Sequence, residues 1–411
     1  MAQTKHFEMS IHVMIMAIIV IPGLRLARSI TLNTEVDVLR ALKERIDPNS
    51  IPDTAFLNTW DFALDPCEST GAHFLGVLCN IPEDNSSSRI IQLDLDGVGY
   101  DGFLTVDIGN LTELTTINLG KNKFRGPIPE SITKLTKLTA FVLSDNFFTG
   151  SLPMGLRRLK RLQELDVSRN KLTGLVPSWI TNFRGLQSLK MASNGFSGRI
   201  PNLAGLWQLT TLDLSGNQLF GILPQLPTSL RTLSLSHNVL SGSIHSLWTL
   251  RNLKIVDLSD NRFSGRIRGI VSLAEITTLN LSVNWFTEIQ VPRFAGESTN
   301  LEVLDVQENR LQGHLPANLP TMQRLTAIYL SHNKLSGPIP RSFGVRLGAP
   351  WRRVYLDNNF LVGNVPPEFV TAKLKVKGSL AHNCLKCPRN VTMCDGGQRP
   401  APECAGQSVS R

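Results

Sequence analysis

One pattern recurs along most of the chain and constrains its fold more than any other feature. It reads L-x-L-x-x-N-x-L-x-G-x-(I/L)-P, with clear copies at residues 117–129 (INLGKNKFRGPIP) and 328–340 (IYLSHNKLSGPIP). Its asparagines recur every 21 to 26 residues, and Val98 takes their place in the first copy. They are Asn122, Asn146, Asn170, Asn194, Asn217, Asn238, Asn261, Asn284, Asn309, Asn333 and Asn359. The period predicts twelve stacked repeats over residues 90–372.

Each residue type in the pattern has a physical role. The alternating L-x-L predicts a short strand with one buried face, and successive strands pair in parallel along the concave side. The asparagine follows the strand, where its amide can bond backbone groups that a buried turn leaves unpaired. Leucines such as Leu135 and Leu159 fill the core from the convex side. The predicted fold is an α/β repeat, a right-handed leucine-rich-repeat solenoid with capped ends.

Two stretches depart from the pattern. The segment between Asn217 and Asn238 is short and carries Pro224 and Pro227 where convex-side apolar residues usually lie, so we expect it to be extended rather than helical. The repeat at Asn284 lacks both the glycine and the I-P pair, which predicts a local irregularity.

Residues 1–29 are typical of a secretory signal peptide. Lys5 precedes an apolar run at residues 11–21, and Ala27-Arg28-Ser29 offers a cleavage site between small residues. The run is shorter than the ~20 residues that span a bilayer, which favours cleavage over an anchor retained in the membrane. The polar C-terminal end predicts neither a second anchor nor a lipid-anchor signal.

The cysteines lie on both sides of the repeats. Residues 30–89 carry a helical pattern through Leu39 and Leu42 and then two cysteines, and residues 373–411 carry four more. The six are Cys67, Cys79, Cys384, Cys387, Cys394 and Cys404. Secretion favours disulfides that close two caps over a zinc site built on the C-x-x-C pair. We expect Cys67–Cys79 and two bridges among the last four, whose pairing the spacing does not assign.

The positive charge is concentrated at the C-terminal end. Of the formal net charge of +9, residues 1–29 carry +2 and residues 341–411 carry +7, so the repeats are close to neutral. This is not the even basic face of a nucleic-acid-binding protein. The basic end could instead meet an acidic wall polysaccharide or an acidic partner through Arg341, Arg346, Arg352, Arg353, Lys373, Lys375, Lys377, Lys386 and Arg389.

The G-x-I-P form of the repeat resembles the plant extracellular type found in receptor-like proteins, receptor-kinase ectodomains and polygalacturonase-inhibiting proteins. The helix, Trp60 and the Gly76-Val77-Leu78-Cys79 stretch resemble that family's N-terminal cap, although the insert at residues 68–74 is longer and Phe74 stands where a tryptophan is common. The end through Gln398-Arg399-Pro400 to Cys404 resembles the cap of some cell-wall repeat proteins. The resemblance implies an apoplastic or cell-wall glycoprotein that recognises other molecules.

No catalytic pattern is present, since the sequence lacks G-x-S-x-G, H-E-x-x-H and a phosphate-binding loop. His237 and His332 lie four strands apart, too far to share a metal. Aspartates recur at one strand position, which is ordinary for this repeat. Two of them, Asp213 and Asp257, approach the spacing of glycosidase carboxylates. The recurring aspartates are Asp94, Asp166, Asp213, Asp257 and Asp305. We therefore expect no enzyme, no cofactor and no metal.

The leading hypothesis is a binding protein whose concave sheet recognises a protein, a peptide or a wall polysaccharide, as a possible component of a signalling or defence receptor with a receptor-kinase ectodomain as partner. Rigid stacking arranges the side chains before binding and so lowers its entropic cost. One alternative is an inhibitor of microbial wall-degrading enzymes. Another is a structural wall protein held to pectin by its basic end.

A ligand patch is expected in the last two repeats. Tyr329 and Tyr355 share one outward strand position there, and tyrosine and arginine are enriched where binding energy is concentrated. Their expected neighbours are Arg353, Asp357, Ser331 and His332. The alternative is that the tyrosines only cover the end of the sheet. N-glycosylation sequons stand at Asn85, Asn110, Asn280 and Asn390, and a glycan on Asn280 would divide the concave face.

Overall fold

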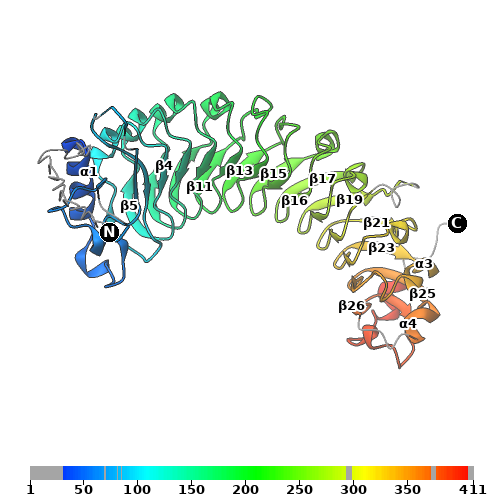
Figure 1. Cartoon of the computed structure of the whole chain (residues 1–411). Helices are drawn as coiled ribbons and strands as arrows, with labels where there is room; N and C mark the ends of the chain where they lie inside the picture. Colours follow the sequence, from blue (N-terminus) through cyan, green and yellow to red (C-terminus); the bar gives the residue numbers. More distant parts are fainter. Residues whose placement is uncertain are drawn as a thin grey trace, which may run out of the picture.

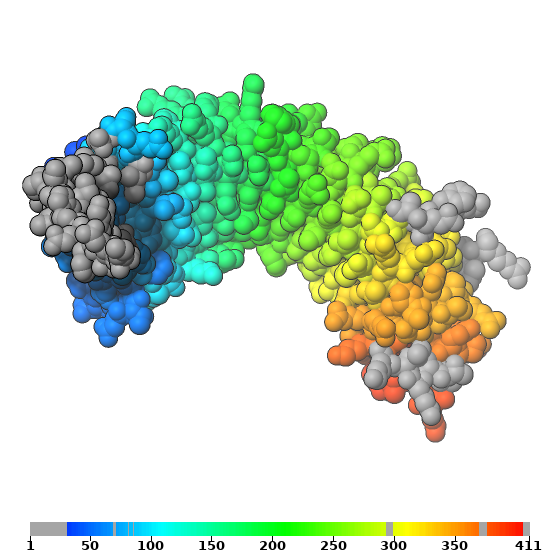
Figure 2. Space-filling view, in the orientation of Figure 1, coloured from blue at the N-terminus to red at the C-terminus, as the bar shows by residue number. Residues whose placement is uncertain are grey.

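The computed structural model describes residues 31–68, 71–80, 82–84, 86–292, 299–371 and 376–405. The predicted signal peptide, Asn85, Lys373 and Lys375 lie outside these residues. The chain forms a curved solenoid, with α1 (Asn33–Glu44) near one end and α4 (Pro367–Thr371) near the other (Figure 1). The space-filling view shows one continuous arch between the two ends (Figure 2).

A sheet of fourteen strands among the described residues runs the length of the arch and forms its concave side. All its strands pair in parallel except the first, which is antiparallel to the second. Its strands, in spatial order, are β1 (Val77–Asn80), β2 (Arg89–Asp94), β4 (Thr116–Asn118), β6 (Ala140–Val142), β8 (Glu164–Asp166), β10 (Ser188–Lys190), β12 (Thr211–Asp213), β14 (Thr232–Ser234), β16 (Ile255–Asp257), β18 (Thr278–Asn280), β20 (Val303–Asp305), β22 (Ala327–Tyr329), β24 (Arg353–Tyr355) and β26 (Lys377–Ser379). The predicted solenoid is therefore confirmed.

A second row of strands follows the asparagine of each repeat, and the sequence analysis did not predict it. Nine of these strands form one sheet: β3 (Asp101–Phe103), β5 (Lys123–Pro127), β7 (Phe147–Gly150), β9 (Lys171–Leu175), β11 (Gly195–Gly198), β13 (Gln218–Gly221), β15 (Val239–Gly242), β17 (Arg262–Ile267) and β19 (Trp285–Ile289). Four more form another: β21 (Gln312–His314), β23 (Lys334–Gly337), β25 (Phe360–Asn364) and β27 (Cys384–Lys386). The break after β19, with a register shift between β17 and β19, is the irregularity predicted for the repeat at Asn284.

Short helical turns form most of the convex side. They are η3 (Val106–Asn110), η4 (Glu130–Lys134), η5 (Met154–Arg158), η6 (Ser178–Asn182), η7 (His245–Thr249), η8 (Ile270–Ser272), η9 (Leu319–Thr321), α3 (Arg341–Val345) and α4. Between Leu223 and Pro227, the stretch that holds both prolines, the chain forms no helical turn, as predicted. Leucines from both sides of the coil make one continuous core, in which Leu135, Leu159 and Leu206 are fully buried.

The asparagines form a hydrogen-bonded ladder through the turns, which confirms their predicted role. The Oδ1 atom of Asn146 accepts from the amide of Phe124 at 2.8 Å, and its Nδ2 atom donates to the carbonyls of Leu119 and Leu143 at 2.8 and 3.2 Å. Each rung thus ties a repeat to its predecessor and satisfies backbone groups that burial would leave unpaired. The residue before the asparagine, such as Lys121 or His332, has a left-handed backbone with φ of 58° or 54°. That conformation is costly for a residue with a side chain, and the ladder stabilises it.

The N-terminal end is covered by α1 and a short hairpin. Val38, Leu39 and Leu42 of α1 are buried against the first repeat. The fully buried carboxylate of Glu35 accepts from Arg89 Nε and from the amide of Ile90, each at 2.7 Å. Phe74 is buried and stacks on Trp60 with ring centroids 6.0 Å apart, so it fills the place that the resemblance gives to a tryptophan. The expected bridge joins Cys67 to Cys79.

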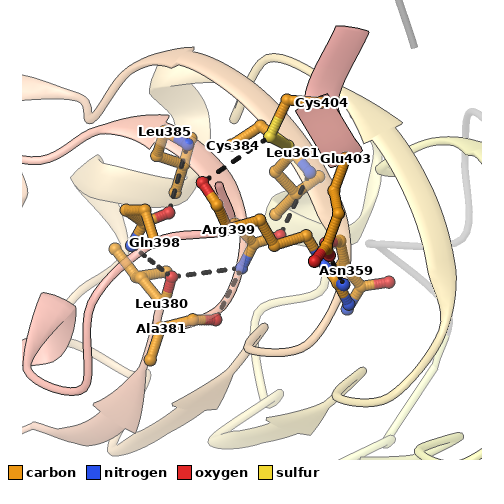
Figure 3. Close-up of a disulfide and its surroundings, with 11 residues drawn as sticks. Asn359, Leu361, Leu380, Ala381, Cys384, Leu385, Gln398, Arg399, Glu403 and Cys404 are labelled. Atoms are coloured by element: carbon orange, nitrogen blue, oxygen red, sulfur yellow. Dashed lines mark hydrogen bonds and ion pairs between the residues drawn. A yellow bond between two sulfur atoms is a disulfide. The ribbon is translucent and has the colours of Figure 1, made fainter. Parts of the chain in front are cut away.

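The C-terminal end continues the ladder before closing it. Asn383 accepts from the amide of Leu361 at 3.1 Å and donates to the carbonyl of Leu356 at 3.0 Å, as the repeat asparagines do. The repeat architecture therefore extends one coil beyond the boundary expected at residue 372. Gln398 then makes the same two bonds to the last coil, from the amide of Leu385 and to the carbonyl of Leu380, each at 3.1 Å (Figure 3).

The last four cysteines form two bridges in this cap, which resolves the pairing that the sequence left open. They are Cys384–Cys404 and Cys387–Cys394. Arg399 lies over the ring of Phe360 at 4.5 Å, donates to the carbonyl of Asn359 at 2.9 Å and pairs with Glu403 at 2.9 Å (Figure 3). The cap is thus joined to the repeats by side-chain bonds and closed by disulfides.

Candidate ligand-binding surface

Most short strands of the long sheet present two side chains to the concave side. In β4, β8 and β12 the middle residue is buried and the first and third are partly exposed. Because the strands pair in register, the third residues form one row along the arch. In the C-terminal half that row runs Asp257, Asn280, Asp305, Tyr329, Tyr355.

The two tyrosines stack on each other in this row. Their ring centroids are 5.3 Å apart and the rings lie 10° from parallel. Both side chains are partly exposed, and their strands β22 and β24 are direct neighbours. A fixed aromatic pair with two hydroxyls offers a ligand a large contact area at low entropic cost, because tyrosine has few rotatable bonds.

A hydrogen-bonded chain lies on the side of the turns. The buried hydroxyl of Ser331 donates to Asp357 Oδ1 at 2.6 Å, and Asn358 Nδ2 donates to Asp357 Oδ2 at 2.8 Å. Asn358 also lies 3.3 Å from Nε2 of the exposed His332. Ser331, which the sequence analysis placed among the contact residues, is 4% exposed, so it positions the Asp357 carboxylate instead. The analysis missed Asn358, although it holds in its repeat the place that His332 holds in the preceding one.

The cationic side of the patch comes from β24 and β26. Arg353 is exposed two residues before Tyr355, and its register partner across β26 is Lys377. Other residues of the predicted basic end already have partners. Arg341 pairs with Glu368 at 2.9 Å, and Arg346 donates to the carbonyl of Pro320 at 2.6 Å. Arg341 is therefore neutralised by Glu368, whereas Arg346 keeps its charge but is held against the repeat before it.

Asp305 is a further member of the patch that the sequence analysis treated as ordinary. It is the register neighbour of Tyr329 on β20. Its burial, with smaller contributions from the negative charges of Asp257 and Glu308, raises the pKa of Asp305 to about 6, and the amide of Gln307 opposes this by donating to it. A carboxyl group beside the tyrosines therefore changes charge near pH 6. We call Asp305, Tyr329, His332, Arg353, Tyr355 and Asp357 the tyrosine surface.

The other candidates stay apart from this surface. His237 pairs with Asp260 at 2.7 Å, four strands away from His332. Asp213 and Asp257 are separated by the strand that carries Ser234, and each binds the serine two residues later. Within the described ranges, no group of three or more histidine, cysteine, aspartate or glutamate side chains could hold a metal ion. The same ranges contain no helix with the length and apolar character to cross a membrane.

Three of the four sequons lie in the described part of the chain. Asn110 ends η3 on the convex side and is exposed, and Asn390 is exposed in the C-terminal cap. Asn280 is partly buried on the concave side, where its Oδ1 accepts from the amide and the hydroxyl of Ser282. Glycosylation at all four remains a prediction.

Comparison with known proteins gives leucine-rich-repeat relatives from plants. Leucine-rich-repeat family models match residues 160–219, and also 113–135, 229–250, 300–322 and 324–345. Receptor-like protein 35 of Arabidopsis thaliana is 37% identical over 187 residues, which are 44% of this chain and 16% of that protein. Receptor-like protein 41 of the same plant is 31% identical over 144 residues, 34% of this chain and 14% of that protein. The chain thus spans about one-seventh of the length of these relatives.

A solved structure shares the architecture. The plant peptide hormone receptor RGFR1, in complex with RGF2, superposes with a TM-score of 0.63 at 29% sequence identity, over 72% of this chain and 52% of that one. These likenesses support the assignment made from the repeats, the caps and the disulfides.

Proposed function

We propose that this chain, a leucine-rich-repeat protein of the plant extracellular type, is a secreted binding protein that recognises a peptide or an extended protein segment on its concave side. The stacked pair of Tyr329 and Tyr355 carries the proposal. A solvent-facing aromatic pair contributes little to folding, whereas exposed aromatic and arginine side chains dominate the energetics of interfaces.

The arrangement around the pair favours a peptide. Asp305 and Asp357 supply carboxylates, Arg353 supplies a guanidinium, and the tyrosine hydroxyls supply hydrogen bonds. Groups of both charges beside an apolar platform are complementary to a peptide that carries both charged and apolar side chains. The likeness to a receptor whose structure was determined with a peptide hormone supports the same choice. A receptor-kinase ectodomain is the proposed signalling partner, and the apoplast or cell wall is the proposed location.

The test begins with the secreted protein purified from plant tissue and mass spectrometry of the molecules that accompany it. The captured ligand is then titrated against Tyr329→Ala and Tyr355→Ala variants. Each should weaken binding about 30-fold, since residues of this kind contribute ~2 kcal/mol or more. The matched control replaces Thr211 and Thr232, outward residues on the neighbouring strands β12 and β14, with alanine and should change affinity less than two-fold. Unchanged affinity in a folded double tyrosine variant would place the binding site elsewhere.

A further inference from the structure

A second surface lies on the nine-stranded sheet, at the opposite end of the arch from the tyrosine surface. Its four outermost strands, β3, β5, β7 and β9, carry Phe103, Arg125, Phe147 and Lys171 in alternation. Each aromatic ring is therefore followed, one repeat later, by a cation. The binding role proposed above does not use this surface.

The rings and the cations are in contact. The guanidinium of Arg125 lies 5.2 Å from the ring centroid of Phe103, and the ammonium of Lys171 lies 4.9 Å from that of Phe147. Phe103 and Phe147 remain 47% and 44% exposed. Two large apolar side chains thus stay open to solvent, as does Phe220 on β13 of the same sheet, whereas most other phenylalanines in the described part of the repeats are buried. Such exposure marks interaction sites.

A cavity of about 290 Å³ opens between these side chains. Its lining, which we call the cation–aromatic groove, consists of Asp101, Lys123, Arg125, Phe147, Thr149 and Lys171. Arg125 is neutralised by Asp101 at 3.1 Å. In the described part of the chain, neither Lys123 nor Lys171 has a carboxylate partner, so the groove carries an excess positive charge beside an exposed ring.

We infer that the cation–aromatic groove binds an anionic sugar residue, carboxylated or sulfated, of an extracellular polysaccharide. The exposed ring of Phe147 offers an apolar platform for the face of a sugar ring. The exposed ammonium groups of Lys123 and Lys171 attract the anionic substituent and can donate charge-assisted hydrogen bonds to it. The Asp101 carboxylate and the Thr149 hydroxyl can accept hydrogen bonds from sugar hydroxyls.

The same lining argues against an acidic protein segment. An acidic side chain brings a carboxylate without a ring to lie on Phe147, whereas an anionic sugar brings its charge, a ring and hydroxyls to the same lining. The volume lies at the lower end of ligand sites, which span about 300–1,000 Å³, so the groove accepts a ring-sized group rather than a folded surface. A polysaccharide would be held at one residue and continue along the outside of the solenoid.

The test titrates the full secreted chain with a galacturonic acid oligomer, with its fully methyl-esterified form and with a sulfated oligosaccharide of equal length. At least one anionic oligomer should bind, and the esterified one, which has the same rings without charge, should bind at least ten-fold more weakly. Whichever anionic oligomer binds more tightly identifies the substituent. Equal binding of the charged and esterified oligomers, or no binding of either anionic one at millimolar concentration, would overturn the inference.

Variants locate the site. Lys123→Gln with Lys171→Gln should weaken binding at least ten-fold, and Phe147→Ala, which leaves the net charge unchanged, about five-fold. The matched control, Arg251→Gln with Arg324→Gln, removes two exposed cations outside the groove and should change affinity less than two-fold. An equal loss in this control would show diffuse attraction between charges, which is screened by salt, and would contradict a defined groove. The Tyr329→Ala, Tyr355→Ala double variant should bind the oligomer normally, so failure of the proposed peptide site and failure of this groove are distinguishable.

Discussion

The two ends of the solenoid are closed by different means. At the N-terminal end a helix buries Val38, Leu39 and Leu42 on the first repeat, and the buried carboxylate of Glu35 bonds to Arg89. At the C-terminal end the asparagine ladder runs one coil further, to Asn383, and Gln398 takes the next rung. The end of a repeat stack has to cover apolar side chains and satisfy backbone groups. The helix chiefly meets the first need and the glutamine the second.

The concave row shows a related difference between its two halves. In the N-terminal half, Asp166 lies 3.6 Å from the ammonium of Lys190. In the C-terminal half, the row neighbours of Asp305 are Asn280 and Tyr329, and the nearby charges of Asp257 and Glu308 are negative. Asp166 in the first half therefore has a cation beside it, whereas Asp305 in the second half has none among its row neighbours.

Among the variants that test the difference between the two ends, Glu35→Ala should lower the free energy of unfolding most. It leaves the amide of Ile90 without its partner and the guanidinium of Arg89 without its buried counter-charge, and breaking such a pair costs about 3 kcal/mol. Urea unfolding, with hydrogen exchange to locate the loss, should show weaker protection over the cap and first repeat. The control is Glu403→Ala, which removes an exposed carboxylate from its pair with Arg399, with a cost below about 1 kcal/mol. Equal losses in the two variants would contradict the distinction between the ends.

A smaller effect is expected at the other end from Gln398→Met. Methionine matches the length of glutamine but removes both bonds of the last rung. The amide of Leu385 then loses its partner, and the carbonyl of Leu380 keeps only the bond from Asn383. The free energy of unfolding should fall by about 2 kcal/mol. Gln163→Met, at an exposed position, serves as the control and should be neutral. If Gln398→Met were also neutral, the last rung would contribute nothing to holding this cap.

The sequence was sufficient where the period determines the contacts. The register of Tyr329 and Tyr355, the ladder role of Asn146 and the non-helical stretch around Pro224 all follow from residues that recur at a fixed spacing. The sequence did not predict contacts that occur only once in the molecule. The bond between Glu35 and Arg89 joins residues outside the repeats, and Gln398 replaces an asparagine with a longer side chain at an irregular spacing.

The same distinction applies to the candidate site. The repeat predicts which side chains face the concave side, so the tyrosines and Arg353 could be identified. It does not predict that Ser331 is buried beneath Asp357, or that Asp305 is desolvated, because both depend on packing between neighbours in three dimensions. The second row of strands, and with it the cation–aromatic groove, was missed because most of these short strands contain a glycine, a residue that is depleted in strands.

The third prediction tests the difference between the two halves of the concave row through pH. The pKa of Asp305 in the folded chain is about 6, above the ~3.9 of an unfolded aspartate, so the folded state holds its proton more tightly. Stability should therefore fall as pH rises from about 4 to about 6 and then level off. The contribution is about 1–2 kcal/mol, since the side chain keeps some contact with solvent. The measurement is the change in melting temperature between pH 4 and pH 7. Asp305→Asn should remove the contribution of Asp305 to that change, whereas Asp166→Asn should leave it in place. A pH profile unchanged by Asp305→Asn would contradict the assignment.

The smallest effect on stability is expected at Asn280, where a glycan would separate the two halves of the concave side. Asn280→Ser removes the sequon, and a serine at the same strand position, Ser234, shows that the fold accepts it. The free energy of unfolding should change by less than about 0.5 kcal/mol, as at most surface positions. Glycopeptide mapping of the secreted protein should show the wild-type site occupied, with Asn110 on the convex side as the reference.

Asn280 lies two strands from Tyr329, roughly 10 Å away at ~4.8 Å per strand, so its glycan would restrict a ligand of the tyrosine surface to the C-terminal strands. Losing that glycan should extend the length of chain that the ligand can contact, whereas Asn110→Gln should not. Modified Asn110 beside unmodified Asn280 would mean that the concave side is one uninterrupted surface.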